Sequence, residues 1–306
     1  MTSSEHSADR LRALLAGPTV VRLPGVFDAV SAGLAAAAGA QAVCLSGATV
    51  SAVDLGLPDF GFVHGTDIAG RAAALLPSLG GVPLLADADT GYGNVLQARR
   101  TTQTYAAAGV AGLHLEDQVA PKRCGHLGGK EVVGVDEAAS RVRAAVDADT
   151  GLVIVARTDA LSVLGRDAVV ERCRAFAAAG ADAVFVEGAS IEDLEAVAAA
   201  LAADGRPLPQ MYNRSEAGGP IDAGPSDERL AEAGVRFVIH PVSAMLAAAE
   251  AVRRTMAAIV GTGHAGAVDR MEWTDLTDLV GLPELLQDEL RYAAGSEPAA
   301  LSEGHR

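Results

Sequence analysis

The sequence predicts an α/β protein, a (β/α)8 TIM barrel with extra C-terminal helices, and three observations carry this prediction. Eight short aliphatic runs recur along the chain, and an alanine-rich helical stretch separates most of them from the next. No GxGxxG sequence opens the first unit, as it would in an open dinucleotide-binding sheet. The length of 306 residues suits one barrel, because such barrels commonly take about 250 residues or more.

The predicted strands are rich in Val, Leu and Ile, and most end in polar or charged residues. They lie at residues 19–23, 42–47, 82–89, 112–117, 152–158, 182–188, 209–213 and 236–241. Helices such as those at 95–109 and 167–181 close with glycine, which accepts the backbone conformation at a helix C-terminus. This alternation predicts parallel strands whose carboxyl ends form the functional face of a barrel.

Two further helices are predicted after the eighth strand, at 244–260 and 273–295. The whole chain is expected to be a single domain, in which the barrel covers about 18–260 and a helical extension covers about 261–295. Residues 296–306 are expected to form a disordered tail.

The charge of the chain limits the partners it can have. It carries 39 acidic and 24 basic residues, which gives a net charge of −15. A protein with this charge repels the phosphate backbone of nucleic acids and anionic lipid, so neither is expected as a partner. An anionic substrate would have to be held by a few local cations or by a metal ion.

Three cysteines, Cys44, Cys124 and Cys173, stand far apart and without the CxxC spacing of a zinc site. Neither a disulfide framework nor structural zinc is expected, which fits a reducing cytosol. The N-terminal residues lack the apolar core of a secretion signal, and no run of about 18 apolar residues is present to span a membrane. We therefore expect a soluble, cytoplasmic protein.

Carboxylates gather at the ends of the predicted strands. Asp87 and Asp89 end the third strand, Glu116 lies at the end of the fourth, and Asp59 lies in the loop after the second. One pocket cannot hold several ionised carboxylates without a countercharge, because like charges raise each other's pKa. Mg²⁺ or Mn²⁺, which prefer oxygen ligands, would supply that charge. A single Asp at a strand end more often caps a helix, so it is Asp87, Asp89 and Glu116 together that favour a metal ion.

A second group of reactive side chains lies in the loop after the fourth strand. Lys122, Arg123, Cys124 and His126 place two cations, a thiol and an imidazole within five residues. Adjacent positive charge lowers the pKa of a cysteine thiol, and nearby glycines would let the loop bring the thiol to a substrate as an acid or a base. The alternative is an exposed basic loop with an unreactive cysteine.

The chain also contains four longer segments, LSGATVSAVDLGLPDFGF, DADTGYGN, GLHLEDQVAPKRCGHLGGK and ARTDA. In this order and spacing they resemble the isocitrate lyase and phosphoenolpyruvate mutase superfamily, in particular its 2-methylisocitrate lyase-like branch, over residues 24 to about 260. KRCGH is the most specific element, because it is similar to the catalytic loop of the carbon–carbon lyases, whereas mutases acting on phosphoenolpyruvate lack its cysteine. The resemblance implies that Lys122, Arg123, Cys124 and His126 are catalytic.

The same resemblance implies a magnesium site and a carboxylate-binding site. Asp87 would bind Mg²⁺, or Mn²⁺ in its place, most directly. Four further residues would hold the ion through water, namely Asp59, Asp89, His114 and Glu116. Arg157 would bind a substrate carboxylate, since a guanidinium group pairs with a carboxylate through two hydrogen bonds. The other substrate-binding residues would be Ser46, Gly47, Ala48, Glu187, Asn213, Ser215 and Ser243.

The implied reaction is the cleavage of a 2-hydroxy di- or tricarboxylate, of the 2-methylisocitrate or substituted-malate type, to an α-keto acid such as pyruvate and a second carboxylic acid. Cys124 would act as the general acid or base. The chain departs from the family pattern at Ala48, where a second glycine is usual, at residues 127–129, and at 213–216. These departures favour a smaller dicarboxylate. His240 also departs from the pattern and has no assigned role.

Three alternatives stay open. The carboxyphosphonoenolpyruvate mutase branch, which performs carbon–phosphorus chemistry, has a loop similar to KRCGHLGGK. Hydrolysis of oxaloacetate to oxalate and acetate could use the same site with water as a participant. A barrel without catalytic activity is the third alternative, but it would have no reason to keep Asp87, Glu116, Cys124 and Arg157 together.

The last predicted helix carries an apolar stripe made by Trp273, Leu276, Leu279, Leu282, Leu285, Leu286 and Leu290. A stripe of this length needs a partner surface, and the simplest one is the barrel of the same chain. The superfamily resemblance instead implies that this region is exchanged between subunits, in helix-swapped dimers that pair into tetramers. The expected assembly is therefore a homo-oligomer, a tetramer.

Overall fold

A computed structural model describes residues 3–125, 128–218 and 224–293. The chain consists of two compact units, one extending to Arg253 and the other starting at Arg254. Within the described ranges, none of the helices combines the length and the apolar character needed to cross a lipid bilayer.

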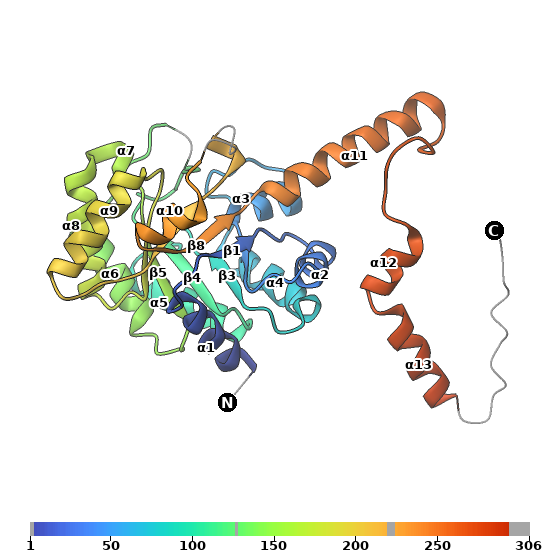
Figure 1. Cartoon of the computed structure of the whole chain (residues 1–306), viewed down its shortest axis with the longest axis horizontal. Helices are drawn as coiled ribbons and strands as arrows, with labels where there is room; N and C mark the ends of the chain where they lie inside the picture. The colour runs from blue at the N-terminus through green and yellow to red at the C-terminus, as the bar shows by residue number, and fades with distance from the viewer. Residues whose placement is uncertain (1–2, 126–127, 219–223, 294–306) are drawn as a thin grey trace. The chain divides into compact units, whose positions relative to one another are not determined.

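All eight predicted strands are present, and they form one parallel sheet in the order β1-β8-β7-β6-β5-β4-β3-β2. The strands are β1 (Val21–Pro24), β2 (Val43–Leu45), β3 (Leu84–Asp87), β4 (Gly112–Glu116), β5 (Val153–Thr158), β6 (Ala183–Val186), β7 (Gln210–Asn213) and β8 (Val235–His240). The two ends of this order meet just after β1, where the Val26 N–H donates to the Cys44 carbonyl oxygen at 2.9 Å. The sheet is thus a nearly closed ring, and the predicted (β/α)8 barrel is confirmed (Figure 1).

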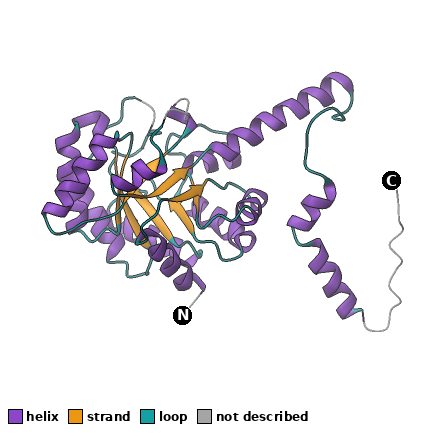
Figure 2. Cartoon of the chain, in the orientation of Figure 1, coloured by secondary structure: helices purple, strands orange, loops and turns teal. Residues whose placement is uncertain are grey.

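Helices surround these strands, as Figure 2 shows by secondary structure. The helices of the first unit, before the one that crosses into the second, are α1 (Ser3–Leu15), α2 (Ala29–Ala37), α3 (Gly47–Val50), η1 (Ser51–Leu55), α4 (Gly65–Leu75), η2 (Leu76–Leu79), α5 (Val95–Ala107), α6 (Val135–Val146), α7 (Leu161–Leu164), α8 (Arg166–Ala178), α9 (Ile191–Ala203), η3 (Glu216–Gly218) and α10 (Asp227–Glu232). The helices predicted at 95–109 and 167–181 are α5 and α8. The buried faces of α5, α8 and the other outer helices pack on the outside of the sheet. Together with strand residues they form the larger of two apolar clusters.

The second apolar cluster fills the inside of the barrel. Phe185, Met211 and Phe237 belong to it, and so do Leu11 and Leu15 of α1. Helix α1 was not predicted, because its apolar residues are few and it has little helical stability of its own. Packing of Leu11 and Leu15 against the barrel interior supplies the stabilisation that local sequence lacks.

The C-terminal region contains α11 (Ser243–Thr262), α12 (Trp273–Leu279) and α13 (Leu282–Tyr292). The prediction of one continuous helix over 273–295 is therefore wrong. The helix ends before Gly281, whose φ of +85° lies in the left-handed region that glycine tolerates. A new helix then begins at Leu282, with Pro283 in its first turn, where a missing N–H is harmless. The predicted tail at 296–306 lies outside the described residues.

Candidate active site

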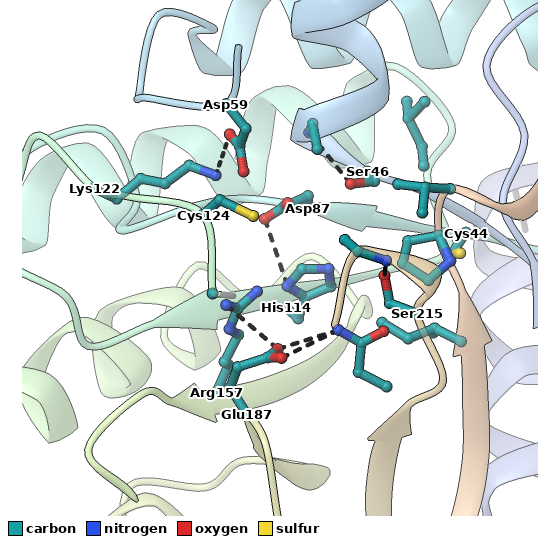
Figure 3. Close-up of a pocket in the computed structure, with 18 residues that line it drawn as sticks. Cys44, Ser46, Asp59, Asp87, His114, Lys122, Cys124, Arg157, Glu187 and Ser215 are labelled. Atoms are coloured by element: carbon teal, nitrogen blue, oxygen red, sulfur yellow. Dashed lines mark hydrogen bonds and ion pairs between the residues drawn. The ribbon is translucent and has the colours of Figure 1, made fainter. Parts of the chain in front are cut away.

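The carboxyl ends of the strands surround one cavity, as expected for the functional face of a barrel (Figure 3). Most predicted site residues line it, and they are Ser46, Ala48, Asp59, Asp87, His114, Lys122, Cys124, Arg157, Glu187, Asn213 and Ser215. Leu45, Ile239 and Val242 add apolar side chains to the wall. The structure therefore gathers into one place residues that lie more than a hundred positions apart in the sequence.

Three predicted site residues, Gly47, Asp89 and Glu116, do not line the cavity themselves and contact residues that do. The backbone N–H of Gly47 donates to Asp87 Oδ2 at 3.1 Å, so it is directed at a carboxylate of the protein. Asp89 Oδ1 lies 3.0 Å from the ammonium nitrogen of Lys122. The backbone N–H of Ala48 donates to Ser46 Oγ at 3.2 Å. The backbone N–H groups of Gly47 and Ala48 therefore already have acceptors within the protein.

Three other predicted residues have different surroundings. The backbone N–H of Arg123 donates to Gln118 Oε1 at 2.9 Å, and its side chain lies near the Gly128 carbonyl oxygen. The Ser243 hydroxyl donates to Glu216, which links the start of α11 to the segment after β7. In the described part of the chain neither Arg123 nor Ser243 lines the cavity. His126 lies outside the described residues.

Asp87 is the buried carboxylate at the end of β3. Its Oδ1 accepts the backbone N–H of Asp89 at 3.0 Å and lies 3.5 Å from His114 Nδ1. Burial raises the pKa of Asp87, but the neighbouring imidazole of His114 and the positive charges of Lys122 and Arg157 outweigh burial and bring the pKa below its ordinary value. Asp87 is therefore ionised and available to a cation.

Lys122 supplies positive charge to this carboxylate group. Its ammonium nitrogen lies 2.6 Å from Asp59 Oδ1 and 3.0 Å from Asp89 Oδ1, and its side chain is only 6% exposed. Burial lowers the pKa of Lys122, yet the surrounding carboxylates outweigh burial and hold the pKa well above its ordinary value. Burial raises the pKa of Asp89 to about 7, against the lowering effect of Lys122. Part of the countercharge that the sequence analysis assigned to a metal ion thus comes from a side chain.

The remaining donor atoms fit a hard cation. Within the described residues, no three His, Cys, Asp or Glu side chains are gathered so that they could enclose a metal ion by themselves. Among the same residues, Glu116 Oε1 and His114 Nδ1 are buried without a hydrogen-bond partner. Ionised Asp87 and the Glu116 oxygen suit Mg²⁺, which prefers oxygen ligands, keeps water and substrate oxygens in its coordination shell and needs few protein ligands. His114 Nδ1 could accept a hydrogen bond from such a water.

Cys124 lies on the wall of the cavity, and its sulfur extends toward Asp87 (Figure 3). The other two cysteines are buried, and of these Cys44 also lines the cavity, whereas Cys173 lies within α8. Burial raises the pKa of Cys44 to about 12, so this thiol stays protonated. Of the three cysteines, Cys124 alone is only partly buried, and it can reach a bound molecule.

Arg157 at the end of β5 pairs with three carboxylates. Its Nε and Nη2 lie 2.9 Å and 3.1 Å from the two oxygens of Asp159, its Nε lies 3.2 Å from Glu116, and its Nη2 lies 3.5 Å from Glu187. Glu187 in turn accepts hydrogen bonds from Asn213 Nδ2 at 3.2 Å and 3.3 Å (Figure 3). Arg157 is thereby held rigidly at the wall of the cavity.

Two contributors were missed as site residues. Asp159 ends the ARTDA segment and was noted as a strand-end residue, but its bidentate pair with Arg157 could have been anticipated only from the fold. Tyr105 of α5 donates its hydroxyl to the Asp87 carbonyl oxygen at 2.7 Å. No signal in the sequence marks Tyr105, because a tyrosine on a buried helix face ordinarily serves packing.

Comparison with known proteins adds to this geometry. Residues 11–260 match the protein family described as phosphoenolpyruvate phosphomutase. A probable 2-methylisocitrate lyase of Corynebacterium glutamicum is 43% identical over 266 residues, which cover 86% of this chain and 84% of the relative.

Solved structures agree over almost the whole chain. An oxaloacetate acetylhydrolase in complex with the inhibitor 3,3-difluorooxalacetate has a TM-score of 0.86 and 35% identity, covering 96% of this chain and 99% of the other. A 2,3-dimethylmalate lyase has a TM-score of 0.85 and 36% identity, covering 98% of both chains. This chain therefore shares its fold with these proteins.

Proposed function

The chain belongs to the phosphoenolpyruvate mutase/isocitrate lyase superfamily, and on this premise we propose that it is a Mg²⁺-dependent carbon–carbon lyase. The substrate is a 2-hydroxy dicarboxylate of the substituted-malate type. Cleavage of its carbon–carbon bond yields an α-keto acid such as pyruvate and a second carboxylic acid.

The charge pattern of the cavity carries this proposal. Among the described lining residues, Lys122 and Arg157 are the only Lys or Arg side chains, and carboxylates of the protein already surround both. Leu45, Ile239 and Val242 make part of the wall apolar. A third carboxylate of the substrate would lie on that wall without a cationic partner, so the loss of its hydration would cost free energy. An alkyl substituent in the same place would gain free energy from burial. A dicarboxylate with a short alkyl group therefore fits better than a tricarboxylate.

Each of the central residues has a defined task in this reaction. Asp87 would hold the metal ion, with Asp59, Asp89, His114 and Glu116 around it, and an ion bound there would supply positive charge to the 2-hydroxyl and the neighbouring carboxylate of the substrate. Arg157 orients the second carboxylate, and its own orientation is set by Asp159 and Glu187. When the bond breaks, a base in the cavity takes the proton of the 2-hydroxyl, which becomes the keto oxygen, and Cys124 gives a proton to the carbon that is released. In the direction of condensation Cys124 removes that proton.

A second candidate activity is the hydrolysis of oxaloacetate to oxalate and acetate. It is favoured by the high similarity to the oxaloacetate acetylhydrolase structure, at a TM-score of 0.86. Oxaloacetate is also a small dicarboxylate, so the charge pattern of the cavity accommodates it as well.

One assay separates the two activities. The purified protein with Mg²⁺ is incubated with 2-alkylmalates, 2-methylisocitrate and oxaloacetate, and the release of α-keto acid and of oxalate is followed. We expect an α-keto acid from an alkylmalate and a lower rate with 2-methylisocitrate. Oxalate from oxaloacetate, without cleavage of any 2-hydroxy acid, would establish the hydrolase instead.

We also propose that the protein is a homo-oligomer, a tetramer in which the C-terminal helices are exchanged between subunits. Large apolar side chains of α12 and α13 are exposed in the single chain, among them Trp273 at 74%, Leu285 at 65% and Leu290 at 62%. Apolar side chains of this size on one short helical segment are ordinarily covered by a partner surface.

A further inference from the structure

Lysine is rare in this chain, and its side chains are buried. It occurs at only two positions, Lys122 and Lys130, while the other 22 basic residues are arginine. Both lysines lie in the segment between β4 and α6, and the side chain of each is only 6% exposed. Lysine is almost never buried unless its ammonium group is paired, so each of these positions requires specific partners. Lys122 pairs with carboxylates of the site. Lys130 has no role in the reaction as proposed above.

Lys130 bridges two parts of the site. Its ammonium group donates to the carbonyl oxygen of Gly125 and lies 3.1 Å from Asp159 Oδ1. Asp159, whose side chain is fully buried, simultaneously binds Arg157 through both of its oxygens. We call this set of contacts, from Gly125 through Lys130 to Asp159, the Lys130 bridge.

Gly125 lies directly against the group that Arg157 forms with Glu187. A Cβ atom at Gly125 would lie 2.6 Å from Arg157 Nη2 and 2.9 Å from Glu187 Cδ, both below contact distance. Only glycine allows the backbone beside Cys124 to come this close. Lys130 therefore holds the backbone next to Cys124 against the side chain that binds the substrate carboxylate.

The anchor of the bridge is itself held firmly. Asp117 Oδ1 accepts the backbone N–H of Asp159 at 2.9 Å, and Asp117 Oδ2 accepts the Thr158 hydroxyl at 2.6 Å. Arg172 of α8 lies 2.8 Å from Asp117 Oδ2. Burial raises the pKa of Asp159, but Arg157 and Lys130 outweigh burial and keep the pKa below its ordinary value. The carboxylate of Asp159 is thus a fixed, ionised point at the end of β5.

We propose that Lys130 is a positioning residue, which sets the distance between Cys124 and the Arg157–Glu187 pair by bonding the Gly125 carbonyl oxygen and Asp159. This inference rests on the proposed function, because it assumes that Cys124 and Arg157 act on the same substrate. Lys130 is not among the described residues that line the cavity. Its contribution is the placement of the thiol, and misplacement of a reacting group by about 1 Å lowers a rate by about 10²-fold.

The rarity of lysine provides a test that needs no substrate. Endoproteinase Lys-C cleaves after lysine, so it can cut the folded chain only after Lys122 or Lys130. In the Asp159→Asn variant Lys130 loses its charged partner, and we expect cleavage after Lys130 to become at least about tenfold faster relative to cleavage after Lys122. Because global unfolding exposes both bonds, this ratio reports local release of Lys130.

The matched control is Asp193→Asn. It makes the same chemical change in an ion pair with Arg166 that lies away from this segment, and it should leave the cleavage ratio unchanged. An unchanged ratio in Asp159→Asn would overturn the proposal. Gly125→Ala provides a second variant, because its methyl group must push the segment away from Arg157 and should raise the ratio as well.

The kinetic arm uses whichever substrate the wild-type protein turns over. Lys130→Met should lower kcat by about 10²-fold and change KM by less than about threefold, because the binding groups stay in place. Lys130→Arg keeps the charge and should recover a large part of the turnover. Wild-type turnover in Lys130→Met would refute the positioning role. If the wild-type protein cleaves no 2-hydroxy acid, the proposed function fails, whereas the cleavage ratio still tests the Lys130 bridge.

Discussion

At the scale of single residues, charge compensation explains how one cavity contains so many carboxylates. Lys122 lies between Asp59 and Asp89, and Arg157 lies among Asp159, Glu116 and Glu187. Like charges alone would protonate several of these groups. The two buried cations keep Asp87 ionised. A metal ion would therefore find one charged carboxylate ligand. Without the cations, the carboxyl groups around it would be mostly protonated and neutral.

Replacement of Cys124 by serine tests the acid–base role. We expect turnover to fall by about 10² to 10⁴-fold, because a hydroxyl is a far weaker acid than a thiol and does not form its anion at neutral pH. Metal binding and the unfolding midpoint should stay at wild-type values, since Cys124 is only half-buried. Cys173→Ala in α8 serves as the control and should affect stability without affecting turnover. Near-normal turnover in Cys124→Ser would remove this thiol from the mechanism.

Replacement of Asp87 by asparagine tests the metal site. Loss of this ionised carboxylate should weaken Mg²⁺ or Mn²⁺ binding by at least about tenfold, measured by calorimetry, because the ion loses its charged ligand. EDTA should abolish the wild-type activity, and added Mg²⁺ should restore it. The control is Asp204→Asn, which removes an exposed partner of Arg174 and should bind metal as the wild type does. Full activity in excess EDTA would contradict the metal requirement.

At the scale of elements, helices outside the barrel hold the ends of the strands in place. The hydroxyl of Tyr105, on α5, reaches the carbonyl oxygen of Asp87 at the end of β3. Arg172, on α8, reaches Asp117 just after β4. The outer helices therefore position the catalytic face as well as covering the sheet.

Removal of the Tyr105 hydroxyl measures this support. Tyr105→Phe should lower the free energy of unfolding by about 1 to 3 kcal/mol in urea titrations, because the buried Asp87 carbonyl loses its donor. Metal affinity should fall with it, since the same bond holds the Asp87 backbone. Tyr92→Phe keeps the bond from Tyr105 to Asp87 and removes only the contact between the two hydroxyls at 3.3 Å. An equal or larger loss in Tyr92→Phe would show that Tyr105 does not support Asp87.

At the scale of the whole molecule, the C-terminal helices are additional to the eight strand–helix units of the barrel. Both α12 and α13 expose large apolar side chains in the single chain. The net charge of −15 opposes unspecific association, so a stable assembly requires a specific apolar interface of this kind.

Deletion of residues 271–306 tests the assembly. We expect light scattering to show a tetramer for the full chain and smaller, aggregation-prone species for the truncated one, because the interface loses its apolar helices. Leu285→Asp should have the same effect through a single side chain, whereas Asp288→Asn, next to Arg291 on the same helix, should leave the tetramer intact. A full-length chain that is a stable, active monomer at micromolar concentration would refute the proposed assembly.

The sequence by itself determined the barrel and the identity of most residues at its mouth. Strand and helix positions follow from local hydrophobic periodicity, and the eight predicted strands all form. Because the carboxyl ends of parallel strands face one side, polar residues at strand ends such as Asp87 and Arg157 had to meet. Local patterns were less informative at α1, which packing stabilises, and between α12 and α13, where apolar spacing continues across the break at Gly281.

Only the tertiary structure decided which charges pair. Lys122 binds Asp59, which is 63 residues away, and Lys130 binds Asp159, which is 29 residues away. Such pairs depend on distances across the barrel mouth and on the burial of both partners, and neither quantity is encoded in the spacing of residues along the chain. The sequence analysis therefore identified the acidic residues of the site, whereas the fold assigned their countercharges, because electrostatic energy depends on separation and on the surrounding medium.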